Sequence, residues 1–256
     1  MQNRKTLLNI SVSALFLALI IGFSYIPNLG YITIGPISFT TIHVIVLIGA
    51  MIFGKRKGAL FGLFFGIFSL LVSLSYPSTI NYLFVNPFVS VLPRVLFGFI
   101  SGCVFDYFRK RLDKKLFLTI CAPIAGILTI FHTFLTLSCL YIFGYLDIFK
   151  ISQALGMMDI IEANEAAFGS FGNFILAFIA PGTVCEAAAS IVLVPTVSSL
   201  YAYEKMPMNF YKLNVVEYVG SGDIKLKKSN VYLMIGASII LVIALSVTIL
   251  TLFYLK

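Results

Sequence analysis

Three titratable side chains stand inside long apolar runs of this sequence, where a charge is costly. Arg94, with Pro93 before it, lies in the run Phe88–Phe105, and His132 and Glu186 lie in two later runs. A charged group at membrane depth is costly unless it has a partner or binds a ligand. The planar guanidinium of arginine donates paired hydrogen bonds to a carboxylate. The pattern therefore predicts an intramembrane binding site in which Arg94 holds an anionic group of a small ligand.

The helical rise brings these three groups to overlapping depths in the outer half of the bundle. At about 1.5 Å per residue, Arg94 lies about 9–12 Å below the outer end of its run, and His132 about 16 Å from the outer end of its own. Glu186 lies somewhat deeper. Two alternatives remain open, namely a structural ion pair between Arg94 and Glu186 and a hydrogen-bonded core role for His132. The ion pair is compatible with a ligand site.

Composition places the site in an integral membrane protein. The chain has 256 residues and is 60% hydrophobic, whereas soluble domains are about 45–50% apolar. At about 20 apolar residues per crossing, the sequence predicts an all-α membrane protein with seven spans. The predicted spans are 7–26, 38–54, 58–76, 88–108, 116–143, 173–203 and 231–255. We expect a membrane domain over 1–203, a linker over 204–230 and an additional transmembrane helix over 231–256.

The net charge is +8, and the basic residues are placed between the apolar spans. This placement indicates membrane topology rather than a nucleic-acid-binding surface. The basic residues gather before span one and between spans two and three, four and five, and six and seven. The positive-inside rule makes these segments cytoplasmic, with the N-terminus inside and the C-terminus outside. The outward segments Pro27–Ile37, Tyr76–Pro87 and Gly144–Gly172 could then roof a pocket, and the middle of the last could be an amphipathic surface helix.

Hydrogen-bonding side chains in and near these outward segments complete the candidate site. An amide in such a position more often caps a helix than contacts a ligand, and His43 is expected to be packed and hydrogen-bonded. The candidate substrate-binding residues are Tyr31, Asn81, Asn86, Arg94, His132, Asn173 and Glu186.

Catalytic and cofactor motifs are missing from the sequence. The segment Gly49–Arg56 nearly spells a phosphate-binding loop, but Arg56 replaces the hydroxyl residue that binds magnesium. Two histidines without an HExxH motif do not form a zinc site, and no GxSxG elbow is present. The four cysteines have no CxxC spacing. We therefore expect no enzyme activity, no metal and no cofactor in this chain.

Small residues recur every four positions in three spans, which allows helices to approach closely. These residues are Ala14 and Ala18 in span one, Gly58, Gly62 and Gly66 in span three, and Gly98 and Gly102 in span four.

The ordered motifs resemble the substrate-binding (S) components of energy-coupling factor (ECF) vitamin importers, and within them the pantothenate-type branch. The resemblance covers about residues 6–203. The motifs are Ile26-Pro27-Asn28-x-Gly30-Tyr31-Ile32, Thr40-Thr41-Ile42-His43, Ile48-Gly49-Ala50-x-x-x-Gly54, Gly58-x-x-x-Gly62-x-x-x-Gly66-x-x-Ser69, Asn86-Pro87-x-x-Ser90-Val91-x-Pro93-Arg94-x-x-x-Gly98 and a late helix with Glu186.

The resemblance implies a six-helix bundle with a vitamin pocket near the outer face, capped by the first outward loop. It also implies a transmembrane coupling subunit that docks on Ala14-x-x-x-Ala18, two cytoplasmic ATPase subunits that use ATP, and toppling of the loaded chain to release its vitamin. The span at 231–255 departs from this pattern. Riboflavin, folate or a pyridoxine-type vitamin stay open as substrates. Proton-coupled secondary transport through His132 and Glu186 and a membrane hydrolase are the alternatives from other classes.

Overall fold

The computed structural model describes residues 2–26, 29–34, 37–75, 83–112, 114–144 and 171–202. This part is almost entirely helical, with one two-stranded antiparallel hairpin. Its elements in chain order are α1 (Gln2–Tyr25), β1 (Tyr31–Ile34), β2 (Ile37–Thr40), α2 (Ile42–Phe53), α3 (Lys55–Ser75), the 3-10 turn η1 (Leu83–Val85), α5 (Pro87–Ser90), α6 (Leu92–Arg111), α7 (Lys114–Cys139), the π-helical turn η2 (Leu140–Gly144) and α11 (Phe171–Ala202). The linker 204–230, the predicted seventh span, Asn81 and the segment 145–170 lie outside the described residues.

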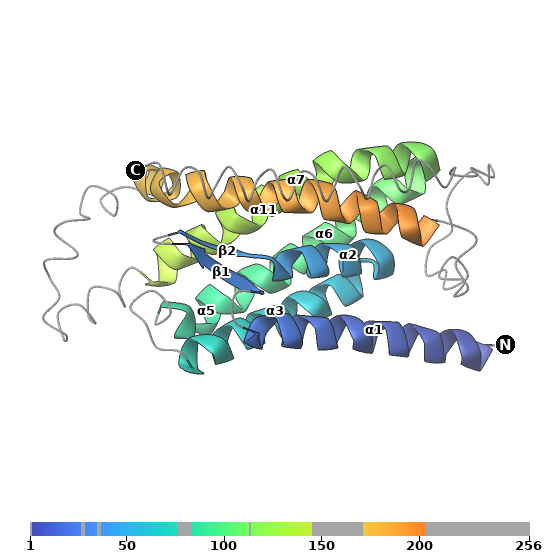
Figure 1. Cartoon of the computed structure of the whole chain (residues 1–256), viewed down its shortest axis with the longest axis horizontal. Coiled ribbons are helices and arrows are strands. Elements are labelled where there is room, and N and C mark those ends of the chain that lie inside the picture. Colours follow the sequence, from blue (N-terminus) through green and yellow to red (C-terminus); the bar gives the residue numbers. More distant parts are fainter. Residues whose placement is uncertain are drawn as a thin grey trace, which may run out of the picture.

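The helices lie side by side along one long axis (Figure 1). The start of α1, the turn between α2 and α3, and the connection between α6 and α7 gather at one end. The hairpin and α5 lie toward the other end. Five phenylalanines are fully buried in the core between the helices: Phe61, Phe65, Phe97, Phe105 and Phe117.

Three described helical segments are long and apolar enough to cross a membrane: Lys55–Ser75, Pro87–Arg111 and Leu116–Phe143. Ile10–Tyr25, Ile42–Phe53 and Gly182–Val197 are shorter apolar helices. Large apolar side chains such as Ile10, Leu15 and Ile127 are exposed on the outside of the bundle, as a lipid-facing surface requires. The described part therefore agrees with an all-α membrane protein, whereas the count of seven spans stays a prediction.

The prediction of a helix from residue 38 was wrong at its start. Ile37–Thr40 form strand β2, which pairs with β1 so that Tyr31 faces Thr40 and Ile34 faces Ile37, and helix α2 begins only at Ile42. The hairpin is rich in β-branched residues, which favour strands. A short apolar run does not reveal by periodicity alone whether it is strand or helix.

The predicted fourth span is divided into two helices. α5 ends at Ser90 and α6 begins at Leu92, with Pro93 in its first turn. Proline is tolerated there because the first amide groups of a helix have no partner within the helix, but it disfavours a continuous helix through the preceding residues. The break places Arg94 in the first turn of α6.

Helices α3 and α6 pack backbone to backbone along their glycine faces. A Cβ atom at Gly62 would overlap the carbonyl oxygen of Arg94, and one at Gly98 would overlap the carbonyl oxygen of Gly58. At Gly66 it would lie 2.6 Å from the Cα of Val91. The spacing that the sequence analysis noted in spans three and four therefore serves contacts between these two helices.

Gly62→Ala should destabilise the protein, because the added methyl group forces the two backbones apart. Overpacking of this kind costs about 1–3 kcal/mol. Gly22→Ala is the matched control, since a Cβ at Gly22 in α1 meets no atom within 4 Å. Thermal unfolding of the two purified variants should give a lowered midpoint for Gly62→Ala and an unchanged or raised midpoint for Gly22→Ala. Equal midpoints would mean that the close approach of α3 and α6 is unimportant.

Candidate functional site

Arg94 is buried near the N-terminal end of α6, with a side-chain environment made of aromatic rings and one carbonyl group. The residue is 4% exposed. Its Nη1 donates to the carbonyl oxygen of Val89 at 2.5 Å, and its Cζ lies 5.1 Å from the ring of Phe84 and 5.6 Å from that of Phe65. Its Nε has no hydrogen-bond partner among the described residues. The Nε–H donor of the guanidinium is therefore available to an additional acceptor.

Arg94 and Glu186 do not form an ion pair. Within the described residues, the salt bridge that the structure contains joins Arg109 to Asp106 at 3.5 Å. Instead, Glu186 Oε1 accepts a hydrogen bond from the backbone amide of Thr40 at 2.7 Å, and Oε2 accepts one from Thr133 Oγ1 at 3.0 Å. Glu186 thus ties the end of the hairpin and helix α7 to α11.

His132 is buried in the bundle against residues of α2, α3 and α6, and neither of its ring nitrogens has a hydrogen bond within the described part. It is 3% exposed. Its ring centroid lies 4.6 Å from that of Phe97, 5.8 Å from Phe65 and 5.7 Å from His43, whose ring is nearly parallel to it. A buried polar group without a partner costs about 1–3 kcal/mol. This geometry does not support the alternative of a core histidine whose hydrogen bonds are satisfied. It suits a side chain that binds a ligand or a water molecule.

His43, by contrast, is hydrogen-bonded through one nitrogen. Its Nε2 lies 2.9 Å from Ser190 Oγ, which in turn lies 2.7 Å from Thr129 Oγ1. The expected packed and hydrogen-bonded role of His43 therefore agrees with this contact. Its ring also stacks on that of His132.

The hairpin brings Tyr31 to the same group. Its hydroxyl is buried and has no hydrogen-bond partner in the described part of the chain. Burial raises the pKa of the Tyr31 phenol, while the nearby Ser69 hydroxyl and the positive charge of Arg94 act to lower it. The phenol therefore stays protonated at neutral pH and offers a hydrogen-bond donor within the electrostatic influence of Arg94.

The hairpin is held in this position at both of its ends. A Cβ atom at Gly30 would overlap the backbone carbonyl of Phe23 in α1, so the chain passes very close to that helix. Thr41 Oγ1 donates to the carbonyl oxygen of Leu29 at 2.5 Å, and the backbone amide of Thr41 donates to the carbonyl oxygen of Gly30 at 2.9 Å. Together with the bond between Glu186 and Thr40, these contacts fix the hairpin to α1 and α11.

Four of the predicted residues are thus close to one another through a short series of contacts. The ring of Phe65 lies against both Arg94 and His132, the phenol of Tyr31 is within the electrostatic influence of Arg94, and Glu186 bonds to Thr133, the neighbour of His132. The groups come from α3, α6, α7, α11 and the hairpin. Their role as ligand contacts stays a prediction.

Several hydroxyl groups of this region were missed from the sequence. Thr136 and Thr183 have buried Oγ1 atoms without partners, again among the described residues, and Thr40 does too. A signal was present, because Thr129, His132, Thr133 and Thr136 follow the i, i+3, i+4, i+7 spacing of one helix face. A polar stripe on an otherwise apolar span would have identified them.

The predicted asparagines have different outcomes. Asn86 is the N-cap of α5, and its Oδ1 accepts a hydrogen bond from the amide of Phe88 at 3.0 Å. Asn81 and the side chain of Asn173 lie outside the described part of the protein.

Asn86→Ala should loosen α5 because it removes this cap. Loss of an N-cap typically costs about 1 kcal/mol. Since α5 carries Val89, whose carbonyl oxygen holds Arg94, the ligand affinity should fall moderately, by less than about tenfold. Asn86→Asp keeps the acceptor and is the control. Isothermal titration should give near-normal affinity for Asn86→Asp. If Asn86→Ala instead loses as much ligand affinity as an Arg94 variant, Asn86 is a direct ligand contact.

Ala14 and Ala18 lie on an open face of α1, and both are exposed. Gly22 continues the same row one turn further, and a Cβ there would meet no atom within 4 Å. Small residues on an exposed helix face allow another helix to approach closely. Within the described part of the chain, the two alanines are therefore available for docking.

The described residues contain no group of three or more His, Cys, Asp or Glu side chains that could hold a metal ion. The polar groups at the centre of the bundle are instead suited to binding an organic anion through hydrogen bonds and the charge of Arg94.

Comparison with known proteins gives a family match and named relatives. The model of the family described as "ECF transporter, substrate-specific component" matches residues 9–198. The chain is 38% identical over 116 residues to the "Pantothenate transporter PanT" of Leuconostoc mesenteroides, a match that covers 43% of this chain and 56% of that protein. It is 29% identical over 123 residues to the "Pantothenic acid transporter PanT" of Lactococcus lactis, with 42% of this chain and 59% of that protein covered.

Each match spans less than two thirds of the relative's own length. The family model, however, extends over most of this chain. The family and both relatives are transporters rather than enzymes. This chain belongs to the family of substrate-specific components of ECF transporters.

Proposed function

We propose that this chain captures pantothenate as the membrane-embedded substrate-binding subunit of an ATP-driven ECF importer. The observation that carries the proposal is Arg94, a buried guanidinium that has one hydrogen bond, to Val89, and no carboxylate partner in the described part of the chain. An unpaired buried charge is unfavourable, so an anionic ligand is the partner that this position lacks. The names of the two relatives support pantothenate as that anion.

The chemistry of pantothenate suits the buried polar group. The molecule has a carboxylate at one end, an amide in the middle and two hydroxyl groups at the other end. The carboxylate pairs with Arg94, assisted by the protonated phenol of Tyr31. The amide and hydroxyl groups can satisfy the two nitrogens of His132 and the hydroxyl of Thr136, which have no hydrogen-bond partner among the described residues. Glu186 keeps its bonds to Thr40 and Thr133 and holds the hairpin over the ligand.

The energy for transport comes from other subunits in this proposal. A transmembrane coupling subunit docks on the open face of α1 through Ala14 and Ala18, and two cytoplasmic ATPase subunits hydrolyse ATP. The loaded chain then topples in the membrane to release its vitamin inward. The membership of the chain in the ECF family supports this division of labour.

Ligand-dependent thermal shift of the purified chain across a panel of vitamins tests the proposal. Pantothenate at a concentration of about 100 times its dissociation constant should stabilise the folded state by about 2.7 kcal/mol. Riboflavin, folate and pyridoxine should give no shift at the same concentration. A shift with another vitamin and none with pantothenate would refute the substrate, and a chain without response to any vitamin would refute the capture role.

A further inference from the structure

Two basic segments that are far apart in the sequence lie together at one end of the bundle. Lys55–Lys57 begin α3 and Arg109–Arg111 end α6. Gly54, with a φ of 77°, allows α2 to end and α3 to begin at once. Gly102 packs so closely on the backbone of Lys55 that a Cβ there would overlap it. The two segments therefore form one surface.

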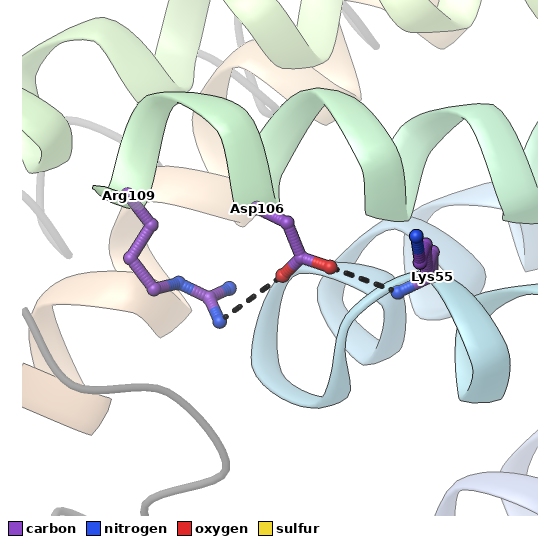
Figure 2. A network of polar contacts seen from close by, with 3 residues as sticks. All are labelled: Lys55, Asp106 and Arg109. Carbon is purple, nitrogen blue, oxygen red and sulfur yellow. Dashed lines mark hydrogen bonds and ion pairs between the residues drawn. The ribbon is translucent and has the colours of Figure 1, made fainter. Parts of the chain in front are cut away.

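Asp106 joins these two segments, because its carboxylate contacts a residue of each. Its Oδ2 accepts a hydrogen bond from the backbone amide of Lys55 at 3.3 Å, and its Oδ1 lies 3.5 Å from Arg109 Nη1 (Figure 2). Arg109 is only 4% exposed and lies over the ring of Phe117. The negative charge of Asp106 is thus matched by a buried arginine, and it does not neutralise the exposed cations around it.

Four exposed cations remain on this surface. They are Lys55, Arg56, Lys110 and Arg111, and none of them forms an ion pair with a carboxylate among the described residues. Asp106 and Glu186 are the acidic side chains that the structure describes, and Glu186 is bonded to the hairpin and α7 instead. Lys57 is excluded from the set, because its Nζ donates to Ser13 Oγ at 2.6 Å and lies 4.3 Å from the ring centroid of Phe53.

The four cations stand at the ends of two predicted membrane crossings. The segments Lys55–Ser75 and Pro87–Arg111 are long and apolar enough to span, and the basic residues are their terminal residues. Arg111 lies 3.7 Å over the ring of Tyr107, which is 52% exposed. Exposed tyrosines and terminal Lys and Arg side chains are typical of the headgroup level of a bilayer. The surface therefore faces lipid headgroups rather than the hydrocarbon.

We propose that Lys55, Arg56, Lys110 and Arg111 form a binding site for the phosphate headgroup of an anionic phospholipid. The charge is complementary, since the surface has four exposed cations and its one described acid is already paired. Clusters of Lys and Arg immediately beside a membrane span attract anionic lipids. The acyl chains of the lipid would lie along the exposed apolar side chains of the same two helices, such as Leu60 in α3 and Phe99 in α6. This site is independent of the proposed vitamin and lies at the opposite end of the bundle.

Native mass spectrometry and thermal shift of the purified full chain with phosphatidylglycerol test this site. Phosphatidylglycerol should bind and raise the unfolding midpoint, and phosphatidylcholine should do neither. Arg56→Gln combined with Lys110→Gln should weaken phosphatidylglycerol binding by about thirtyfold. The charge-preserving control, Arg56→Lys with Lys110→Arg, should keep most of it. All three proteins should have the same unfolding midpoint in phosphatidylcholine, which shows that the substitutions do not disturb the fold.

Three outcomes would overturn the lipid site. Equal stabilisation by phosphatidylcholine would mean that the surface does not select charge. An equal effect of inorganic phosphate would mean that a free anion, rather than a lipid, is the ligand. A neutralised variant that keeps its lipid response but no longer associates with the coupling subunit would make the surface a protein-docking site.

Discussion

Arg94→Gln should lower the affinity for pantothenate by about 100-fold or more while the chain stays folded. Removing one partner of a buried charged pair costs about 2–5 kcal/mol, and each 1.4 kcal/mol is a factor of ten. The amide of glutamine can still donate to the carbonyl oxygen of Val89, so a hydrogen bond between α6 and α5 is retained. Isothermal titration of the wild type and the variant measures the loss.

Two further measurements distinguish a binding role of Arg94 from a structural role, namely the stability of the ligand-free variant and the affinity of Arg94→Lys. Arg94 is buried without a carboxylate partner in the described part of the chain, so its removal relieves an unfavourable desolvation. The ligand-free variant should therefore unfold at the same temperature as the wild type or higher. Arg94→Lys keeps the charge but loses the planar fork, and it should bind with intermediate affinity. A large drop in stability of the ligand-free Arg94→Gln protein would indicate that Arg94 serves the fold.

Ala14→Leu combined with Ala18→Leu should abolish assembly with the coupling subunit and hence transport, while pantothenate binding stays normal. Both alanines are exposed on α1, and leucine side chains there would hold a partner helix away from the close approach that small residues allow. The alanines are exposed on α1, whereas Arg94 and His132 are buried on α6 and α7, so the ligand site should be undisturbed. Co-purification with the coupling subunit, vesicle uptake and thermal shift with pantothenate measure the three properties.

Ile127→Leu combined with Val184→Leu is the control for added leucine on an exposed helix face. These residues are 67% and 62% exposed on α7 and α11, so the control should assemble and transport normally. If the Ala14 and Ala18 variant still transports, α1 is not the docking face. Uptake by vesicles that contain this chain alone, driven by a proton gradient, would favour the alternative of a secondary transporter.

Much of the fold was predictable because apolar runs and glycine spacing are local signals. The long spans at α3 and α7 follow from hydrophobicity alone, and the glycines of α3 and α6 indicated a close helix contact that the structure contains. The strand Ile37–Thr40 was not predictable in this way, since a four-residue apolar segment before a helix reads as part of that helix. Its pairing with Tyr31–Ile34 depends on a partner strand that hydropathy does not consider.

The candidate site was predictable to the extent that charge in an apolar run is conspicuous. Arg94, His132 and Glu186 stood out for that reason, and the structure brings them near one another through Phe65 and Thr133. Hydroxyl groups such as those of Thr136 and Thr183 did not stand out, since threonine is common in membrane helices and its hydroxyl can bond to the backbone of its own helix. The partners of Glu186 could not be foreseen either, because the backbone amide of Thr40 reaches it only after the hairpin has folded.

The most direct test of the account compares pantothenate with its neutral alcohol analogue, in which a hydroxyl replaces the carboxylate. If Arg94 holds the carboxylate, isothermal titration of the wild-type chain should give about 100-fold tighter binding of pantothenate than of the alcohol. In Arg94→Gln this preference should disappear, with both compounds bound weakly and about equally. Equal affinity of the wild type for the two compounds, or a preference that persists in Arg94→Gln, would contradict the claim that this buried guanidinium recognises the anion.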